Sequence, residues 1–564
     1  MWHRGGGPTV KKTDIEIALS HKLEPISNIA EKAGLERDDI HLYGDHIAKI
    51  KLSARNGREA TAKTVLVTAM TPTRAGEGKT TCAIGLNEGL NRLGKRSIVT
   101  LREPSLGPVF GLKGGAAGGG YSQVLPMVDI NLHFTGDIHA VTAAHNLLTA
   151  LLDNEYSRPR GAFLLPKNII WNRVIDMNDR ALRNIVLGLG KAAGQVREGM
   201  FEITAASEIM AILGLSRDLD NLKARLGNII VAKSSNGDPV RARDIEAQGA
   251  MAILLRNALK PNLVQTIEGN PAIVHTGPFA NIAHGTNSII ATDMARRLAD
   301  IVVVEAGFGS DLGAEKYLNL VSRRPGMVPP DVVVIVATIR ALRHHGGVPV
   351  KDLDEPNVKA VVEGMDNLRK HVENMNSFNR PVVVALNRFE GDSQEELDKV
   401  VEYARGDGTA IAVCDVWGKG GGGAAELAEM VWDASLEEHG DVNYVYDLDE
   451  PLESKIEKIV TRIYGGERAN FLRSAKRDMD QIRDWGYTDI PVCMAKTQSS
   501  LSDNPRLKNR PTDFSVEIRN VKMCGGAGFA VVYTADIMTM PGLPESPAAA
   551  GMDIDNEGVV TGLF

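Results

Sequence analysis

The stretch with the clearest chemistry is Thr71-Pro72-Thr73-Arg74-Ala75-Gly76-Glu77-Gly78-Lys79-Thr80-Thr81. It follows the phosphate-binding pattern G-x-x-x-x-G-K-[ST], except that Thr73 occupies the first glycine position. In that pattern, loop N–H groups surround a phosphate, Lys79 reaches the β- and γ-phosphates, and the Thr80 hydroxyl is a ligand of Mg²⁺. We therefore expect residues 73–81 to bind a nucleoside triphosphate. The alternative, a glycine-rich turn with a solvated lysine, is disfavoured by the elements on either side.

Charged side chains form a second group of candidates. Arg102 comes directly after a short apolar run, where a guanidinium could hold a transferring phosphoryl group with two parallel hydrogen bonds. The alternative is an ion pair with Glu103 or a neighbouring acid. Arg74 lies five residues before Lys79, and we favour a solvent-exposed side chain there over a phosphate contact.

A third group follows the glycine-dense segment Gly107–Gly120. Among His133, Asp137 and His139, the carboxylate is the best candidate to orient an amine nucleophile or take its proton. Either histidine could instead be an ordinary hydrogen-bonded loop residue.

Two aromatic residues complete the candidates. Phe308 lies between Gly307 and Gly309, and Trp417 precedes Gly418. A large ring beside glycines has little local packing of its own, so the pair could stack on a flat ligand. The alternative is that each ring packs against its own loop. Because only 5% of the chain is aromatic, we expect a stacking clamp.

The elements that must position these residues are short apolar strands. Val65–Val67 leads into the 71–81 loop, and Ala83, Leu86, Leu90 and Leu93 then form one face of a helix that stops at Gly94. Further β-branched runs recur at helix-spaced intervals: Ser97–Leu101, Ala272–His275, Ile301–Val304, Val332–Val336, Val382–Leu386 and Ala410–Cys414. This pattern predicts an α/β fold, a P-loop-type and mostly parallel sheet covered by helices. Ligands of such sheets bind beyond the carboxyl ends of the strands, where the candidates above should meet.

Changes in character along the chain predict its domains. We expect a nucleotide-binding domain in two parts, residues 1–174 and 271–455, with residues 12–60 as a helical cover over the first strand. Residues 175–270 are predicted to be an inserted α-rich subdomain. Residues 456–564 are predicted to be a C-terminal α+β domain, in which Phe514–Arg519 alternates like a half-buried strand.

Composition excludes several classes. Of the 564 residues, 43% are hydrophobic and 24% charged, and the net charge of −7 gives no basic field for nucleic acid. The four cysteines contain no C-x-x-C pair, so neither a zinc site nor a disulfide framework is indicated. Scattered thiols and the lack of long apolar runs favour a cytoplasmic protein without a membrane partner.

Several long motifs resemble the formate–tetrahydrofolate ligase family. They are Thr71–Thr81, Leu101–Pro108 with the glycine-dense segment, Asn131–Asp137, Gly277–Gly285, Glu305–Lys316, Val336–Leu342 and Met538–Pro544. The similarity runs from about residue 12 to the C-terminus. Thr73 in place of the first glycine is also typical of this family.

The resemblance implies ATP-dependent ligation of formate to tetrahydrofolate, giving 10-formyltetrahydrofolate, ADP and phosphate through formyl phosphate. It implies Mg²⁺, a monovalent cation (K⁺ or NH₄⁺), a homotetramer, and a folate substrate that can carry a polyglutamate tail. It assigns Phe308 and Trp417 to the pterin ring, with adenine nearer Asn387 and Lys419. Glu103, Pro541 and Gly542, within the matching motifs, are expected to contact substrate.

Two other classes use similar loops. A switch-type P-loop ATPase would hydrolyse ATP whether or not formate and tetrahydrofolate are present. A scaffold with a degenerate nucleotide site is disfavoured, because Lys79 and Thr80 are intact.

Overall fold

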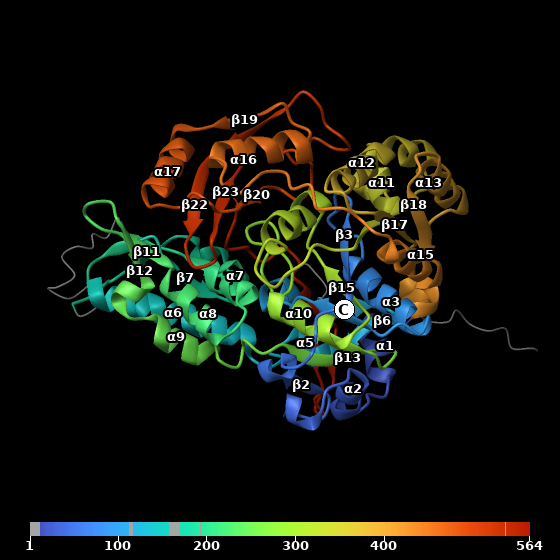
Figure 1. Ribbon diagram of the computed structural model, residues 1–564, viewed down its shortest axis with the longest axis horizontal. Helices are drawn as coiled ribbons and strands as arrows, with labels where there is room; N and C mark the ends of the chain where they lie inside the picture. The colour runs from blue at the N-terminus through green and yellow to red at the C-terminus, as the bar shows by residue number, and fades with distance from the viewer. Residues whose placement is uncertain (1–11, 112–116, 157–167, 192–193, 536, 564) are drawn as a thin grey trace, which may run out of the picture.

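A large, mainly parallel β-sheet forms the centre of the computed structural model, which describes residues 12–111, 117–156, 168–191, 194–535 and 537–563. The main path of the sheet is β1-β2-β13-β14-β4-β15-β3-β16-β17-β18, and β14 through β18 along this path pair in parallel. The bounds of these parallel strands are β14 (Pro271–Val274), β4 (Ser97–Leu101), β15 (Ile301–Glu305), β3 (Lys63–Ala69), β16 (Val332–Ala337), β17 (Val382–Asn387) and β18 (Ala410–Cys414). The strands predicted from apolar runs are confirmed, and because they pair in parallel their carboxyl ends share one edge. Figure 1 labels β3, β15, β17 and β18 among them.

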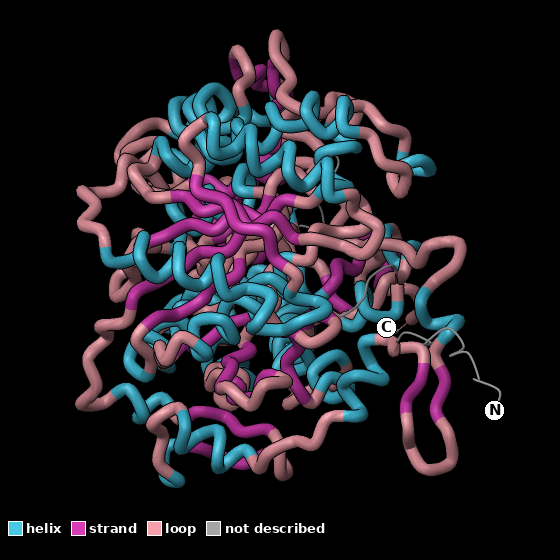
Figure 2. Tube along the Cα trace, turned by 90° about the vertical axis from the view of Figure 1, so that its right-hand side faces the viewer, coloured by secondary structure: helices cyan, strands magenta, loops and turns pink. Residues whose placement is uncertain are grey.

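Alternate residues of these strands enter two different cores, which explains why both faces are apolar. On β3, Val65 and Val67 pack with helices α3 (Lys79–Arg92) and α15 (Ala425–Leu436), whereas Leu66 packs with α10 (Ile289–Leu298) and α12 (Val358–Ser377) on the other face. Strands buried on both sides need β-branched residues at nearly every position, as the sequence has. Figure 2 shows the strands in the interior with helices on either side.

The N-terminal region differs from the prediction. Residues 12–60 were expected to be a helical cover, but besides α1 (Asp14–Ser20) and α2 (Ile26–Lys32) they form β1 (Ile40–Tyr43) and β2 (Ile47–Ile50). These strands pair antiparallel with each other, and β2 pairs antiparallel with β13 (Asn262–Thr266). The β1–β2 hairpin therefore extends the sheet, and it brings Lys49 toward the carboxyl end of the neighbouring parallel strands.

The region predicted as an inserted subdomain holds α7 (Glu208–Leu215), α8 (Leu219–Gly227) and α9 (Gln248–Leu255) with short strands between them. Its last strand, β13, already belongs to the central sheet. The C-terminal region contains a small sheet of β20 (Val492–Ala495), β23 (Phe529–Tyr533) and β22 (Asn520–Cys524), next to β21 (Ser515–Ile518) and α17 (Arg473–Asp484). No helix within the described ranges is long and apolar enough to cross a membrane.

Candidate functional site

The 71–81 loop joins the end of β3 to the start of α3. Gly78, the residue before the helix, has a left-handed backbone with φ of +70°, and a Cβ built on it would lie 2.5 Å from Asn387 Nδ2. Only glycine fits this position, because a side chain would be strained and would clash. Backbone N–H groups at the beginning of a helix favour an anion, so the loop has the geometry of a phosphate cradle.

Glu77 braces this loop from inside. Its side chain is buried, and Oε1 accepts a 2.6 Å hydrogen bond from the Thr73 N–H while Oε2 accepts one from the Thr338 hydroxyl. Asn387 Nδ2 donates to the Glu77 carbonyl oxygen at 3.1 Å. Of the residues predicted to bind the nucleotide, Glu77 and Asn387 therefore make contacts that hold the shape of the loop.

Glu305, at the end of β15, connects the loop to Arg102. Its Oε2 accepts a 2.8 Å hydrogen bond from the Thr80 hydroxyl, and its Oε1 lies 3.1 Å from Arg102 Nη2. The predicted alternative of an ion pair with a neighbouring acid thus applies to Arg102, and the acid is Glu305. Among the described residues, the buried Arg102 Nε has no hydrogen-bond partner.

The loop after β15 passes close to Arg102. A Cβ on Gly307 would lie 2.8 Å from Arg102 Nη1, so this position requires glycine. The next residue, Phe308, has φ of +59°, a strained conformation for a bulky side chain that often marks a functional site. Phe308 is only partly buried, which leaves part of its ring accessible.

Carboxylates and one lysine form a buried cluster beyond β4. Lys49 Nζ lies 2.8 Å from both oxygens of Asp137, and Asn262 Nδ2 donates to Asp137 Oδ2 at 2.9 Å. Burial raises the pKa of Glu103 well above its ordinary value, the charges of Asp137 and Asp176 raise it further, and Lys49 opposes them. The predicted candidate Asp137 is thus engaged as an ion pair, while His133 and His139 are exposed.

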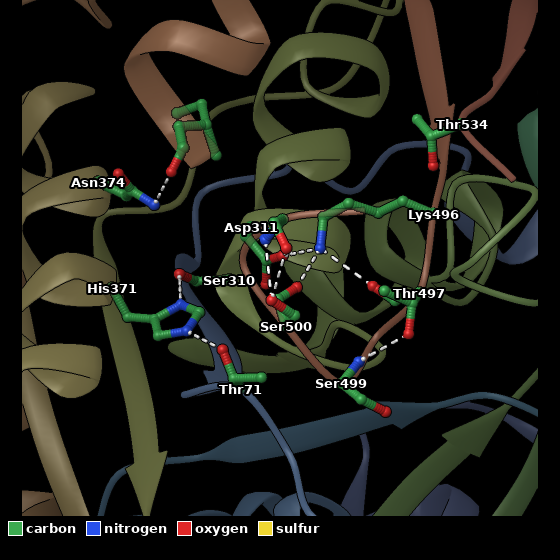
Figure 3. A network of polar contacts seen from close by, with 12 residues as sticks. Thr71, Ser310, Asp311, His371, Asn374, Lys496, Thr497, Ser499, Ser500 and Thr534 are labelled. Atoms are coloured by element: carbon green, nitrogen blue, oxygen red, sulfur yellow. Dashed lines mark hydrogen bonds and ion pairs between the residues drawn. The ribbon is translucent and has the colours of Figure 1, made fainter. Parts of the chain in front are cut away.

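A network of buried polar groups holds the first residue of the loop (Figure 3). The Thr71 hydroxyl is 2.9 Å from His371 Nε2, and His371 Nδ1 is 2.7 Å from the Ser310 hydroxyl, two residues after Phe308. Burial lowers the pKa of His371 to about 4, so the ring is neutral at pH 7 and accepts a hydrogen bond at one nitrogen.

The C-terminal region completes this network. Lys496 is fully buried, lies 2.8 Å from Asp311 and donates to the Ser500 carbonyl oxygen at 2.5 Å. The Asn509 N–H donates to His345 Nδ1 at 2.9 Å, and His345 Nε2 is 3.0 Å from the Thr71 carbonyl oxygen. The C-terminal region therefore contacts both the 71–81 loop and the loop that carries Phe308.

A model of the formate–tetrahydrofolate ligase family matches residues 12–564, essentially the whole chain. The chain belongs to this family. It is an ATP-dependent ligase that joins formate to tetrahydrofolate in one-carbon metabolism. The resemblance seen in the sequence motifs is thereby confirmed.

The remaining ligase candidates lie around the same edge of the sheet. Trp417, on α14 (Val416–Lys419), donates from Nε1 to Asp14 Oδ1 at 3.0 Å, and its ring lies 2.7 Å from a Cβ built on Gly120. Lys419 lies 3.1 Å from Asp415 and is largely exposed. Phe308 follows β15 and Trp417 follows β18 in the chain. In the sheet, strands β3, β16 and β17 lie between β15 and β18. The clamp of Phe308 and Trp417 stays a prediction.

The segment with Pro541 and Gly542 packs beside η5 (Arg180–Arg183). Arg183 Nε donates to the Met540 carbonyl oxygen at 2.9 Å, and a Cβ on Gly542 would lie 2.7 Å from Arg180 Nε. The core of the glycine-dense segment, residues 112–116, lies outside the described residues.

Several residues of the site were not singled out from the sequence, and Glu305, Lys49 and His371 are examples. Glu305 had a usable signal, since an acid directly after a fully apolar strand lies at the edge where ligands bind. Lys49 and His371 had none, because each acts through partners distant in the sequence.

Proposed function

We propose that the 71–81 loop binds the ATP phosphates and that formate is activated as formyl phosphate between Lys79 and Arg102. The observation that carries this proposal is the double contact of Glu305, which connects the Arg102 guanidinium to the Thr80 hydroxyl. A cation fixed there would face both the γ-phosphate and the formate oxygens. Phosphoryl transfer depends mainly on such positioning and charge stabilisation.

In the first step, a formate oxygen attacks the γ-phosphorus and the bond from that phosphorus to the ADP oxygen breaks. In the second step, the N10 amine of tetrahydrofolate attacks the formyl carbon, phosphate leaves with the former formate oxygen, and the amine loses a proton. We propose that Asp137 orients the amine or takes its proton. Its ion pair with Lys49 supports the orienting role, since Lys49 Nζ lies 2.8 Å from both carboxylate oxygens and so fixes their position.

The donors around Thr80 fit Mg²⁺. A hydroxyl and a carboxylate are oxygen ligands of the kind that this cation takes, and Thr80 and Glu305 already lie 2.8 Å apart through these atoms. When bound, Mg²⁺ would neutralise phosphate charge. Phe308 and Trp417 are proposed to bind the pterin ring, Asn387 and Lys419 the adenosine, and Glu103, Pro541 and Gly542 other parts of the substrates.

Three further proposals rest on family membership: we propose activation by K⁺ or NH₄⁺, a homotetramer, and use of polyglutamylated folates. From the changes of character along the sequence we propose the domain division at residues 174, 270 and 455, with β13 of the middle part pairing into the central sheet. A cytoplasmic location is proposed because all four cysteines are free. Loss of ligase activity when tetramethylammonium replaces K⁺ would support the monovalent-cation proposal. The molar mass measured by sedimentation tests the homotetramer.

Positional isotope exchange tests the intermediate. With ATP labelled by ¹⁸O in the β,γ-bridge, the label should move to a non-bridging β-position when formate is present, without tetrahydrofolate. Exchange that needs tetrahydrofolate would exclude a separate formyl phosphate step. Release of ADP should require both formate and tetrahydrofolate, whereas a switch-type ATPase would release it without either.

A further inference from the structure

A hollow of about 400 Å³ lies beside the first half of the nucleotide loop. Three parts of the chain enclose it: residues 72–75 of the loop, α11 (Ile339–His345) with the segment after it, and residues 499–508 of the C-terminal region. The loop residues that line it end at Ala75, so Lys79 and Thr80 are not part of its wall.

The wall of this hollow is basic. Arg74, Arg340 and Lys508 line it, together with His344. Asp354 forms an ion pair with Arg340, at 3.3 Å from Nη2. Because the Asp354 side chain is 84% exposed, solvent and salt largely screen its charge. Within the part of the chain that the structure describes, two buried nitrogens, Arg340 Nε and His344 Nδ1, have no hydrogen-bond partner.

The cations also affect one another. The pKa of Lys508 is lowered by burial and then by the charge of Arg74. Glu77 accepts hydrogen bonds from Thr73 and Thr338, and its charge also acts on this wall, where it opposes the lowering of the His344 pKa by burial. The three cations Arg74, Arg340 and Lys508 therefore face two acids, Glu77 and Asp354. The excess of positive charge at one hollow favours an anion there.

The rest of the wall is apolar: Pro72, Val350, Leu353 and Pro505 line it as well. Guanidinium forks and an ammonium match the oxygens of a phosphate group, and an apolar wall suits a small body attached to it.

We propose that this hollow is a second anion site, which binds a phosphate group, either free phosphate or a small phosphate monoester, at the same time as ATP occupies the loop. The hollow is lined by residues 72–75, in the first half of the 71–81 loop, whereas Lys79 and Thr80 in its second half are not among its lining residues. The proposal does not depend on the roles given to Lys79 and Arg102.

Equilibrium dialysis with ³²P-labelled inorganic phosphate tests the proposal, using the full chain saturated with Mg²⁺ and a non-hydrolysable ATP analogue. One phosphate should bind per chain, and it should bind equally in Lys79→Ala. The double variant Arg340→Gln/Lys508→Gln should weaken binding by about tenfold or more, because charge-assisted hydrogen bonds are lost. The matched control Lys351→Gln removes a nearby exposed charge beside the lining residue Val350 and should bind as the parent does.

Unchanged binding in the double variant, or no saturable binding in the parent, would overturn the proposal. Loss of binding when the ATP analogue is present would also overturn it and would assign the phosphate to the nucleotide cradle. A parallel measurement with phenyl phosphate distinguishes the two sources: tighter binding than inorganic phosphate indicates a monoester, and weaker binding indicates free phosphate. Dialysis reports this site even if the isotope-exchange test of formyl phosphate fails.

Discussion

His371 connects the 71–81 loop, which we propose binds ATP, to the loop that carries Phe308, which we propose binds tetrahydrofolate. Its replacement should therefore impair the use of both substrates. Its ring bridges the hydroxyls of Thr71, at the start of the nucleotide loop, and Ser310, near Phe308. His371→Leu fills a similar volume but leaves both hydroxyls with one hydrogen bond fewer. The Thr71 hydroxyl keeps the hydrogen bond that it accepts from Asn367 Nδ2, whereas Ser310 loses its bond to the ring. A buried polar group left unsatisfied costs about 1–3 kcal/mol, which applies in full to Ser310 alone.

Steady-state kinetics with each substrate varied in turn show where this cost appears. Because about 1.4 kcal/mol corresponds to a tenfold change, even part of the cost should raise the KM for both ATP and tetrahydrofolate several-fold. His345→Leu is the matched control, since His345 is also buried and contacts Thr71 but not Ser310. It should raise the KM for ATP alone. Ser310→Ala, a milder change, should affect tetrahydrofolate more than ATP.

The pH dependence of unfolding gives a second readout for His371. The unfolded chain takes up a proton below pH 6.5, whereas the folded chain does so only near pH 4, where burial has moved the pKa of this ring. Stability therefore falls as pH falls from 6.5 to 4, and the gap is equivalent to about 3 kcal/mol. His371→Leu should show a shallower loss of thermal midpoint over this range. A lower midpoint with unchanged KM values for both substrates would refute the coupling and leave a purely structural role.

Four further replacements test the proposed catalytic roles. Lys79→Ala should lower kcat/KM by about a hundredfold or more while far-ultraviolet circular dichroism stays unchanged; near-normal turnover would disprove phosphate binding by this lysine. Arg102→Lys keeps the charge but loses the two-pronged geometry, so kcat/KM should fall about tenfold or more, and parental activity would show that the fork is not needed. Trp417→Ala should raise the KM for tetrahydrofolate about tenfold and that for ATP less; the reverse pattern would assign the ring to adenine. Asp137→Asn breaks the buried pair with Lys49, which costs about 3–5 kcal/mol, so its pH–rate profile is measured at low temperature, and a profile identical to the parent would argue against proton transfer.

The parallel strands were predictable because burial on both faces leaves a strong signal. Ser97–Leu101 and Ala410–Cys414 have the bounds that their apolar runs indicate, since each run ends where polar residues begin. Strand β1 of the β1–β2 hairpin was missed for the opposite reason. On β1, the residues after Ile40 are exposed, so polar and apolar positions do not distinguish this edge strand from a helical cover.

The site was predictable as a set of segments but not as a set of contacts. Glycine patterns located the loop at Gly76–Gly78 and the turn around Phe308, because close backbone approaches leave a signal within a few residues. Buried ion pairs between distant residues leave no such signal in the local sequence. Lys49 and Asp137 are 88 residues apart in the chain, and their pairing depends on a hairpin whose position in the sheet is set by distant strands.

Strand order explains why Glu305 in particular was not recognised. β3 and β4 follow each other in the chain with only α3 between them, so Thr80 and Arg102 would be expected to face each other directly. In the sheet, β15 lies between β3 and β4 and pairs with both in parallel. The residue at its carboxyl end is therefore inserted between the nucleotide loop and the guanidinium, and a carboxylate at that point can contact both. Thr80 and Arg102 are thus connected through Glu305, a residue that lies some two hundred positions later in the chain.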